Sequence, residues 1–327
     1  MTDHPSDTRP PDDAGTDTFR HEPVMLAEVL AVFATCDLGV IVDATVGGGG
    51  HSRALLEAHA HVSVVGLDQD PMALAAAGSE LAEFGSRVTL CRSRFDDMRG
   101  QLDALGVAAI AGFLFDLGVS SPQLDRADRG FSYRHDGPLD MRMDPAGRVD
   151  ASTIVNEAPE IELARILRNY GDERYASRIA AAIVRSRPLH ATAELAEIVR
   201  DAIPAPARRR GGHPAKRTFQ ALRIAVNREL EILPGALDQA VALLAPGGRG
   251  AVLSYHSGED RIVKDRFRFA ENGGCVCPPR LPCACGAVRH VRLLTRGGRT
   301  PSAEEIERNP RAASARLRSV EKLAVPS

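Results

Sequence analysis

Short apolar runs alternate with amphipathic stretches over the first third of the chain. Runs bounded by turn residues predict strands over 40–46, 62–67, 87–91 and 110–117. Between them, apolar residues at three- to four-residue spacing predict helices over 52–60, 71–83 and 96–105. Because strands that alternate with helices usually pair in parallel, this pattern predicts an α/β fold with a doubly wound sheet.

The alternation stops after the fourth strand. Residues 120–150 are polar and rich in turn formers, and 159–203 carry apolar residues at helical spacing, which predicts a helical insertion. A long helix is predicted from Lys216 to about Ile232, followed by a turn and a strand that ends at Ser254. Residues 288–295 and 315–322 are predicted to close the sheet as an antiparallel edge hairpin.

These elements divide the chain into two predicted domains. The sheet domain comprises 20–130 and 218–327, and the inserted helical domain comprises 131–217. Residues 1–19, rich in Asp, Pro and Thr, form a predicted disordered leader.

Composition narrows the class of protein. Of 327 residues, 44% are hydrophobic, enough for a sizeable core. The formal net charge of -2 favours neither the presence nor the absence of a nucleic-acid partner, so any basic surface must be local. No apolar run approaches the length of a membrane span, and the first residues include no apolar signal segment. We therefore expect a cytoplasmic protein with no membrane partner.

Four glycines, Gly47 to Gly50, follow the first predicted strand and lead into a helix. Strand, glycine loop and helix in this order form a cradle for a nucleotide-like cofactor, and Asp68 ends the next strand where a carboxylate can accept both ribose hydroxyls. A dinucleotide fingerprint needs a glycine at the sixth position, where Ser52 or Arg53 stands, and a P-loop would end in Gly-Lys-Ser or Gly-Lys-Thr. S-adenosylmethionine, with ribose and adenine but no phosphate, fits better. The alternative is a tight turn without a ligand.

A polar segment follows the fourth strand, whose last acid is Asp116. An exocyclic amine on a base is a poor nucleophile, so a site that methylates it must accept its hydrogen bonds and then its proton. Asp116, Ser121 and Gln123 are the candidate acceptors. Methylation at carbon 5 of a pyrimidine would need a cysteine nucleophile, and the sequence has none between Cys91 and Cys275.

The motifs along the chain resemble those of the bacterial RsmH (MraW) family. They are 45–52 (TVGGGGHS), 116–125 (DLGVSSPQLD), 129–132 (RGFS), 136–144 (DGPLDMRMD), 213–215 (HPA), 217–224 (RTFQALRI) and 259–264 (EDRIVK). The resemblance covers nearly everything from His21 to about Leu323. Gln69, Tyr255 and Gly258 depart from it, standing where the family usually has Arg, Phe and Leu.

The resemblance implies a class I, Rossmann-like S-adenosylmethionine-dependent methyltransferase with a mostly parallel sheet and an inserted helical domain. It implies methylation of the exocyclic N4 of a cytidine in small-subunit (16S) ribosomal RNA, by direct in-line transfer. The partner would be that RNA or the assembled small subunit, and the oligomeric state stays open, a homodimer included. The implied cofactor site takes in the glycine loop, the residue after it and side chains at later strand ends: Gly47, Gly49, Gly50, His51, Asp68, Phe95, Asp116 and Gln123. Without the resemblance, Phe95 is predicted to be a core residue, because most aromatic side chains are buried for packing.

Three features serve the predicted RNA contact. The basic loop around Arg208, Arg209, Arg210, Lys216 and Arg217 suits phosphates, with an ordinary solvated loop as the alternative. Side chains for stacking on or guiding the base follow the first polar segment: Phe131, Tyr133, Arg134 and His135. Asp140 and Arg142 are expected to hold that loop closed, with an ion-paired structural loop over 136–144 as the alternative.

Two other function classes and a cysteine cluster remain. A nucleotide-dependent oxidoreductase is disfavoured by the missing glycine, and a non-catalytic RNA-binding assembly factor would need no cradle. Four cysteines, enough to ligate a metal ion, stand in one loop: Cys275, Cys277, Cys283 and Cys285. Their Cys-x-Cys spacing is unusual for structural zinc. Free reduced thiols are favoured there, and no catalytic metal is predicted.

Overall fold

The computed structural model describes residues 23–36, 38–208, 212–278 and 283–324. The predicted leader over 1–19 and two arginines of the basic loop, Arg209 and Arg210, lie outside the described residues. No helix in the described ranges is long and apolar enough to cross a membrane.

A seven-stranded sheet forms the centre of the described chain, with the strand order β3-β2-β1-β4-β5-β7-β6. The strands are β1 Gly39–Asp43, β2 Val62–Asp68, β3 Val88–Arg92, β4 Ile110–Asp116, β5 Leu244–Ser254, β6 Val291–Leu293 and β7 Arg316–Lys322. β1 to β5 pair in parallel, and β7 runs antiparallel to both β5 and β6. The predicted doubly wound sheet with an antiparallel edge is therefore confirmed.

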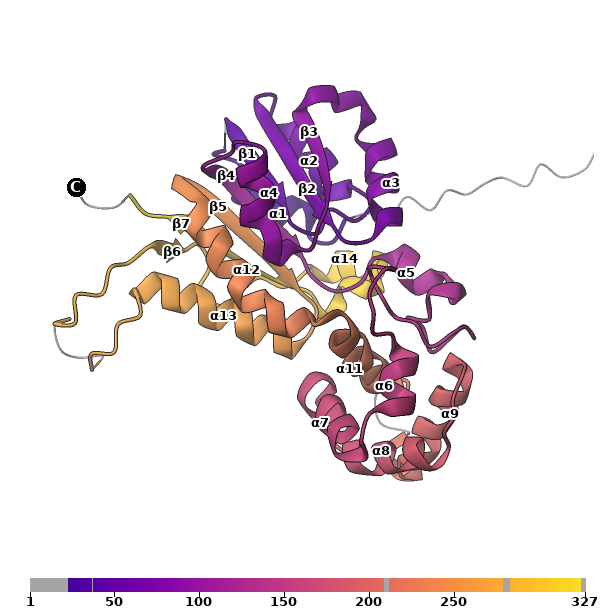
Figure 1. The fold of residues 1–327 in the computed structure, drawn as a ribbon. Helices are drawn as coiled ribbons and strands as arrows, with labels where there is room; N and C mark the ends of the chain where they lie inside the picture. The colour runs from indigo at the N-terminus through magenta and orange to yellow at the C-terminus, as the bar shows by residue number, and fades with distance from the viewer. Residues whose placement is uncertain (1–22, 37, 209–211, 279–282, 325–327) are drawn as a thin grey trace, which may run out of the picture.

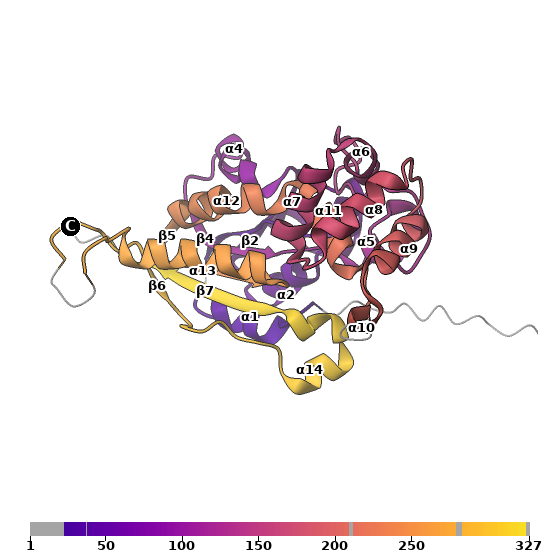
Figure 2. The same cartoon turned by 90° about the horizontal axis from the view of Figure 1, so that it is seen from below.

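Helices cover both faces of this sheet (Figures 1 and 2). One face packs against α1 Leu26–Phe33, α2 Gly50–Ala58 and α3 Pro71–Glu80; the other packs against α4 Met98–Ala104, α12 Glu229–Leu243 and α13 Ser257–Asn272. β4 shows why: Phe113 and Phe115 point to the α12 side, and Leu114 points to the α1 side. Because a central strand is buried on both faces, it reads as a continuous apolar run.

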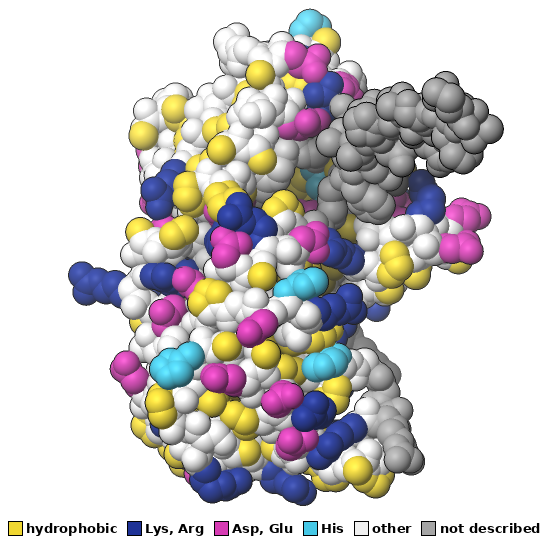
Figure 3. Space-filling view, turned by 90° about the vertical axis from the view of Figure 1, so that its right-hand side faces the viewer, with side chains coloured by type: hydrophobic (Ala, Val, Ile, Leu, Met, Phe, Trp, Pro, Cys, Tyr) yellow, Lys and Arg dark blue, Asp and Glu magenta, His cyan; other side chains and the backbone are white. Residues whose placement is uncertain are grey.

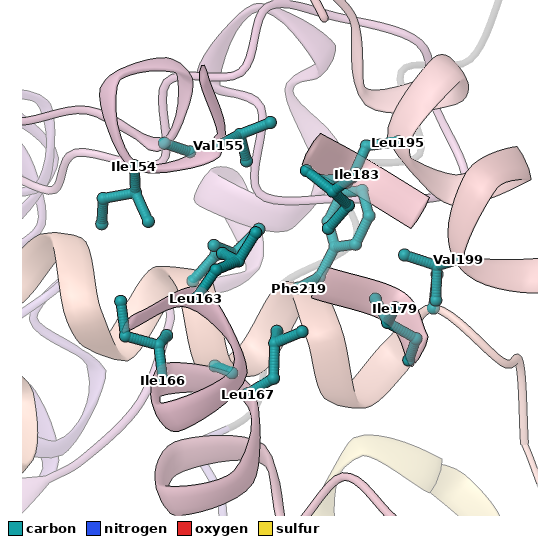
Figure 4. Close-up of a cluster of buried hydrophobic side chains, with 14 of the residues drawn as sticks. Ile154, Val155, Leu163, Ile166, Leu167, Ile179, Ile183, Leu195, Val199 and Phe219 are labelled. Carbon is teal, nitrogen blue, oxygen red and sulfur yellow. The ribbon is translucent and has the colours of Figure 1, made fainter. Parts of the chain in front are cut away.

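A second hydrophobic core lies beside the sheet, among helices that follow the polar segment (Figures 1 and 4). These helices are α6 Ala151–Glu157, α7 Glu160–Gly171, α8 Ala176–Arg185, α9 Thr192–Ala202 and α11 Lys216–Asn227. Leu163, Leu167, Ile179 and Ile183 point into this core in the close-up, together with Phe219 from α11. The short helices elsewhere are α5 Ser121–Asp125, α10 Ala205–Arg208 and α14 Ala303–Arg308.

The predicted helix from Lys216 to about Ile232 is wrong in its extent. α11 ends at Asn227, Arg228 has a left-handed backbone with φ of 56°, and α12 starts at Glu229. The buried Asn227 side chain explains the break, because its Nδ2 donates to the Met141 carbonyl oxygen at 2.8 Å and its Oδ1 accepts from the Met143 N–H at 2.8 Å. Tertiary hydrogen bonds therefore end a helix that local propensity would continue.

Candidate active site and cofactor cradle

Three carboxylates end three neighbouring strands at one edge of the sheet. Asp43 is the last residue of β1, Asp68 of β2 and Asp116 of β4. In open α/β sheets this carboxyl edge, beside the strand-to-helix turns, is where ligands bind. Asp68 and Asp116 are predicted site residues, whereas the sequence pattern predicts no role for Asp43. The Asp43 side chain is buried and accepts a hydrogen bond from Ser52 Oγ at 2.7 Å.

The glycine loop connects β1 to α2 across this edge. Gly47 and Gly49 have φ of 52° and 87°, so both need the left-handed freedom of glycine. A methylene group on Gly50 would lie 2.6 Å from Pro23 Cγ, so this glycine allows the N-terminal segment to pack closely. A side chain on Gly48 would meet nothing within 4 Å, which leaves that side of the loop open to a ligand.

Asp68 is held against the loop by two backbone donors. The Gly47 N–H donates to its Oδ2 at 3.0 Å, and the Asp70 N–H donates to its Oδ1 at 2.9 Å. Burial nevertheless raises the pKa of this carboxyl from 3.8 to about 6, with the carboxylates of Asp70 and Asp43 adding to the rise. Burial also raises the pKa of Asp43. The sheet edge therefore favours a partner that carries positive charge or donates hydrogen bonds.

Asp116 is fixed from three directions. Its backbone N–H donates to Thr45 Oγ1 at 2.7 Å, and its Oδ1 accepts from the Tyr255 hydroxyl at 2.7 Å. Its Oδ2 lies 3.6 Å from His51 Nδ1. Burial raises the pKa of Tyr255 well above 10, and the negative Asp116 adds to the shift, so this phenol remains a donor. In the sequence Tyr255 stands out only as a departure from the family, because no local pattern reveals its hydrogen-bond partner at the end of β4.

His51 has a defined donor nitrogen. Its Nε2 lies 3.0 Å from the Val24 carbonyl oxygen, which can only accept. Nε2 therefore carries a proton, and Nδ1 is the nitrogen that faces Asp116. The structure places His51 beside Asp116, and the cofactor contact of both stays a prediction.

Gln123 is buried beneath the segment after β4. Its Nε2 donates to Asp70 Oδ2 at 2.9 Å, and its Oε1 accepts from the Ser120 N–H at 3.0 Å in a capping box at the start of α5. Arg129 donates to the same Asp70 oxygen at 2.9 Å. Asp70 also caps α3 through the Met72 N–H, and its position before Pro71 is the one local signal that predicts this role. The catalytic and cofactor roles of Gln123 stay predictions.

Phe95 starts a short 3-10 helix, Phe95–Asp97, after β3 and is half-buried. Its ring packs edge-on against Phe115 of β4, with centroids 5.6 Å apart. One side therefore belongs to the core, as the residue alone suggested, and contact with an adenine stays a prediction. The side chain of Ser121 lies outside the described residues, so its catalytic role stays a prediction.

The segment over 129–144 is held by its own ion pairs. Arg142 donates to both oxygens of Asp140 at 2.8 and 2.7 Å, and also to the Gly147 carbonyl at 2.9 Å. This pair agrees with the predicted closing of the loop by Asp140 and Arg142 and equally with an ion-paired structural loop, so the role in holding a base stays a prediction. Phe131, however, is 5% exposed within the helical core, so its predicted stacking on a base is wrong: the ring is used for packing.

Two of the remaining RNA-contact candidates, Tyr133 and Arg134, lie together with His213 on the helical part. Tyr133 stacks on His213 with ring centroids 4.4 Å apart, and the Arg134 guanidinium lies over the Tyr133 ring. Arg208 is occupied locally, donating to the Ile203 carbonyl at 2.7 Å. On the face shown in Figure 3, Lys and Arg side chains are interspersed with Asp and Glu, so this face offers no broad basic surface.

The cradle fits S-adenosylmethionine. The loop 47–50 holds no lysine or arginine for a phosphate, one glycine is open to a ligand, and the carboxylates of Asp68 and Asp116 end strands at the same sheet edge. With a parallel sheet ending in an antiparallel pair, fold and site define a class I methyltransferase whose cofactor is S-adenosylmethionine.

Comparison with known proteins places the chain within this class. The model of the MraW methylase family matches residues 18–323. Ribosomal RNA small subunit methyltransferase H of Heliobacterium modesticaldum is 57% identical, covering 93% of this chain and 99% of that protein. The same-named protein of Symbiobacterium thermophilum is 51% identical, over 93% and 97% of the two chains. The chain therefore belongs to the MraW methylase family.

A solved structure gives a weaker likeness. The rRNA methylase from Streptococcus thermophilus aligns with a TM-score of 0.40 at 12% identity, covering 90% of this chain and 93% of that one.

Proposed function

We propose that the protein methylates the exocyclic N4 of a cytidine in small-subunit (16S) ribosomal RNA. Relatives at 51% and 57% identity bear the name of a small-subunit ribosomal RNA methyltransferase, which supports the class of substrate. The position of the Asp116 carboxylate carries the choice of an amine. It ends β4 beside the glycine loop and is oriented by Tyr255 and faced by His51.

In this proposal Asp116 accepts a hydrogen bond from the amine. The lone pair of N4 is delocalised into the base, so a negative acceptor makes the nitrogen a better nucleophile. S-adenosylmethionine, when bound, supplies a methyl group on a positively charged sulfur. As the N–C bond forms and the C–S bond breaks, the amine loses a proton to Asp116, whose Oδ2 lies 3.6 Å from His51 Nδ1. Tyr255 keeps one Asp116 oxygen fixed throughout.

The same arrangement supports direct in-line transfer without a covalent enzyme intermediate. A cysteine nucleophile would have to lie beside Asp116, but the segment 116–125 contains none. Cys91 is in β3, and Cys36 packs in the core on the α1 side of the sheet. An in-line displacement inverts the methyl carbon, so transfer from chirally labelled S-adenosylmethionine should give inverted product.

We assign recognition of the RNA to the helical domain over 131–217. Its hydrophobic core is separate from those of the sheet and continues past residue 217 to Phe219 of α11. The exposed Lys216 and Arg217 stand at the start of α11, which leads back to the sheet. Arg217 keeps its charged end near the Asp172 carbonyl at 3.1 Å. A base that leaves its stack would enter between this domain and the sheet edge.

The direct test is incubation of the protein with labelled S-adenosylmethionine and small subunits that lack the modification. The subunits are compared with free ribosomal RNA and with assembly intermediates. We expect label in N4-methylcytidine after nucleoside analysis. Label in 5-methylcytidine or in a ribose would contradict the amine as acceptor, and no label in any of the three RNA forms would contradict the substrate.

Asp116→Asn separates the two roles open to this carboxylate. Near-normal cofactor affinity with transfer reduced at least about 100-fold indicates that Asp116 orients the amine, since loss of a positioned proton acceptor costs about that much or more. Lost cofactor affinity indicates a binding role instead. Asp128→Asn is the matched control, because Asp128 is exposed and pairs with Arg126 nearby.

A further inference from the structure

The connection between α13 and β6 brings four cysteine sulfurs to one point. Cys275 and Cys277 follow the end of α13, and Cys283 and Cys285 precede β6. All four Sγ atoms lie within 4.8 Å of one another. The Sγ–Sγ distance is 3.5 Å between Cys275 and Cys283, 3.5 Å between Cys283 and Cys285, and 3.7 Å between Cys275 and Cys285.

These separations match a tetrahedral tetrathiolate site. Four sulfurs at ~2.3 Å from a central zinc ion stand ~3.8 Å apart, whereas a disulfide brings two sulfurs to ~2.05 Å. The sulfurs are therefore spaced for a shared metal and not for disulfide pairs. From this geometry we propose that the four cysteines bind one structural zinc ion.

Packing does not explain why the cysteines converge. Val276, between the first two, is 88% exposed, and Cys283 and Cys285 are themselves exposed. A loop with so little buried apolar surface gains little from the hydrophobic effect, and thiols make only weak hydrogen bonds. A metal ion supplies the stabilisation that the loop otherwise lacks.

The backbone around the cluster is shaped for such a site. Gly273 and Gly274 both have positive φ, which turns the chain back at the end of α13, and a Cβ on Gly273 would lie 2.2 Å from the Val288 carbonyl oxygen. The His290 N–H donates to the Ala270 carbonyl at 3.0 Å, which closes the base of the connection. Among the cysteines themselves, the Ala284 N–H donates to Cys277 Sγ at 3.4 Å, and a donor of this kind stabilises a thiolate.

The Cys-x-Cys spacing, unusual in sequence, is thereby accounted for. In extended chain, residues two apart point to the same side, so each short segment presents two sulfurs and leaves the middle residue outside. Val276 is that middle residue in the first segment. Two such segments face each other and complete the set of four ligands, so the expectation of separate free thiols gives way to a shared site.

Four thiolates leave no open coordination position, so the zinc is structural and takes no part in methyl transfer. The connection projects from the β6 edge of the sheet, away from the helical domain (Figure 1). The bound zinc ion holds the end of α13 and the start of β6 together.

The test is the zinc content of full-length protein reduced, incubated with zinc sulfate alone and passed through gel filtration. We expect about one zinc ion per chain, the stoichiometry of a tetrathiolate site. Cys277→Ser should lower this at least about tenfold under mild chelation, since one of four ligands is lost. Cys91→Ser, which removes a thiol from β3, should retain the full content.

A second measurement uses the wild-type chain only and so does not depend on a variant that folds. Removing zinc with a chelator should speed tryptic cleavage after Arg289, which is exposed beside the cluster. Zinc well below stoichiometry in the wild type, equal zinc in wild type and Cys277→Ser, or a mass showing disulfides would each overturn the proposal. Iron bound in place of zinc after incubation with both metals would overturn the choice of metal.

Discussion

Lowering the pH should weaken cofactor binding because it protonates Asp68. The pKa of this carboxyl sets the pH range over which the affinity should fall. Burial raises the pKa of this carboxyl from 3.8 to about 6, although two backbone N–H groups donate to it. The predicted contact of Asp68 with both ribose hydroxyls requires the ionised form, because a protonated carboxyl has become a donor at one oxygen. A group with a pKa of about 6 is about 90% ionised at pH 7 and about 10% at pH 5.

The expected loss of affinity follows from these fractions. Between pH 7 and pH 5 the affinity should fall about tenfold, which corresponds to about 1.4 kcal/mol. The effect on the empty protein has the opposite sign. A carboxyl whose folded-state pKa is raised stabilises the fold when protonated, so its contribution is largest below pH 3.8 and is lost as the pH rises through about 6. Acid should therefore weaken binding while it increases the contribution of Asp68 to stability.

Titration calorimetry with S-adenosylhomocysteine from pH 5 to pH 7.5, at constant ionic strength, measures the affinity. Urea unfolding of the empty protein over the same range measures the stability. Asp68→Asn should bind more weakly at pH 7 and lose the tenfold dependence, whereas Asp103→Asn, a change at an exposed acid that pairs with Arg99, should retain it. Equal wild-type affinities at pH 5 and pH 7, or a full tenfold dependence in Asp68→Asn, would refute the reasoning.

Three substitutions test the contacts that hold the site. Asp70→Ala leaves the nearly buried Arg129 without its carboxylate and should cost about 3–5 kcal/mol in urea unfolding, with Asp70→Asn losing less. Asn227→Ala leaves two buried backbone groups of the 129–144 segment unsatisfied, so we expect a loss of about 2–4 kcal/mol in the same assay. Tyr255→Phe removes one donor to the partly exposed Asp116, about 1 kcal/mol, and should lower kcat/KM about fivefold in methyl-transfer assays with little change in Tm.

The sheet and the glycine loop were predictable because their signals are local. Each buried strand reads as an apolar run, and Asp68 and Asp116 stand where such a run ends. In a parallel sheet those ends share an edge, so the two acids could be placed near the loop without coordinates. Tyr255 has the same kind of position, directly after β5, but which oxygen its hydroxyl reaches depends on the packing of β4 against β5.

The break between α11 and α12 shows what local signals miss. Arg228 is neither glycine nor proline, so nothing at this position predicts a left-handed residue, while Pro234 lies inside α12 where a break would be expected from sequence. The break depends on Asn227, whose amide binds backbone groups more than 80 residues earlier in the chain. Gln123 likewise binds Asp70, and such long-range polar pairs follow only from the assembled fold.

The repulsion among the strand-end acids also bears on the order of binding and release. Burial is the main cause of the raised pKa of both Asp43 and Asp68, with Asp116 adding to the first shift and Asp43 to the second, so three carboxylates share the sheet edge. In the predicted cofactor site, S-adenosylmethionine would bring a positive sulfur to these carboxylates and relieve the repulsion, whereas the neutral thioether left after transfer would not. The electrostatic attraction is therefore lost in the step that consumes the methyl group, and we expect the edge that favours the substrate to favour release of the product.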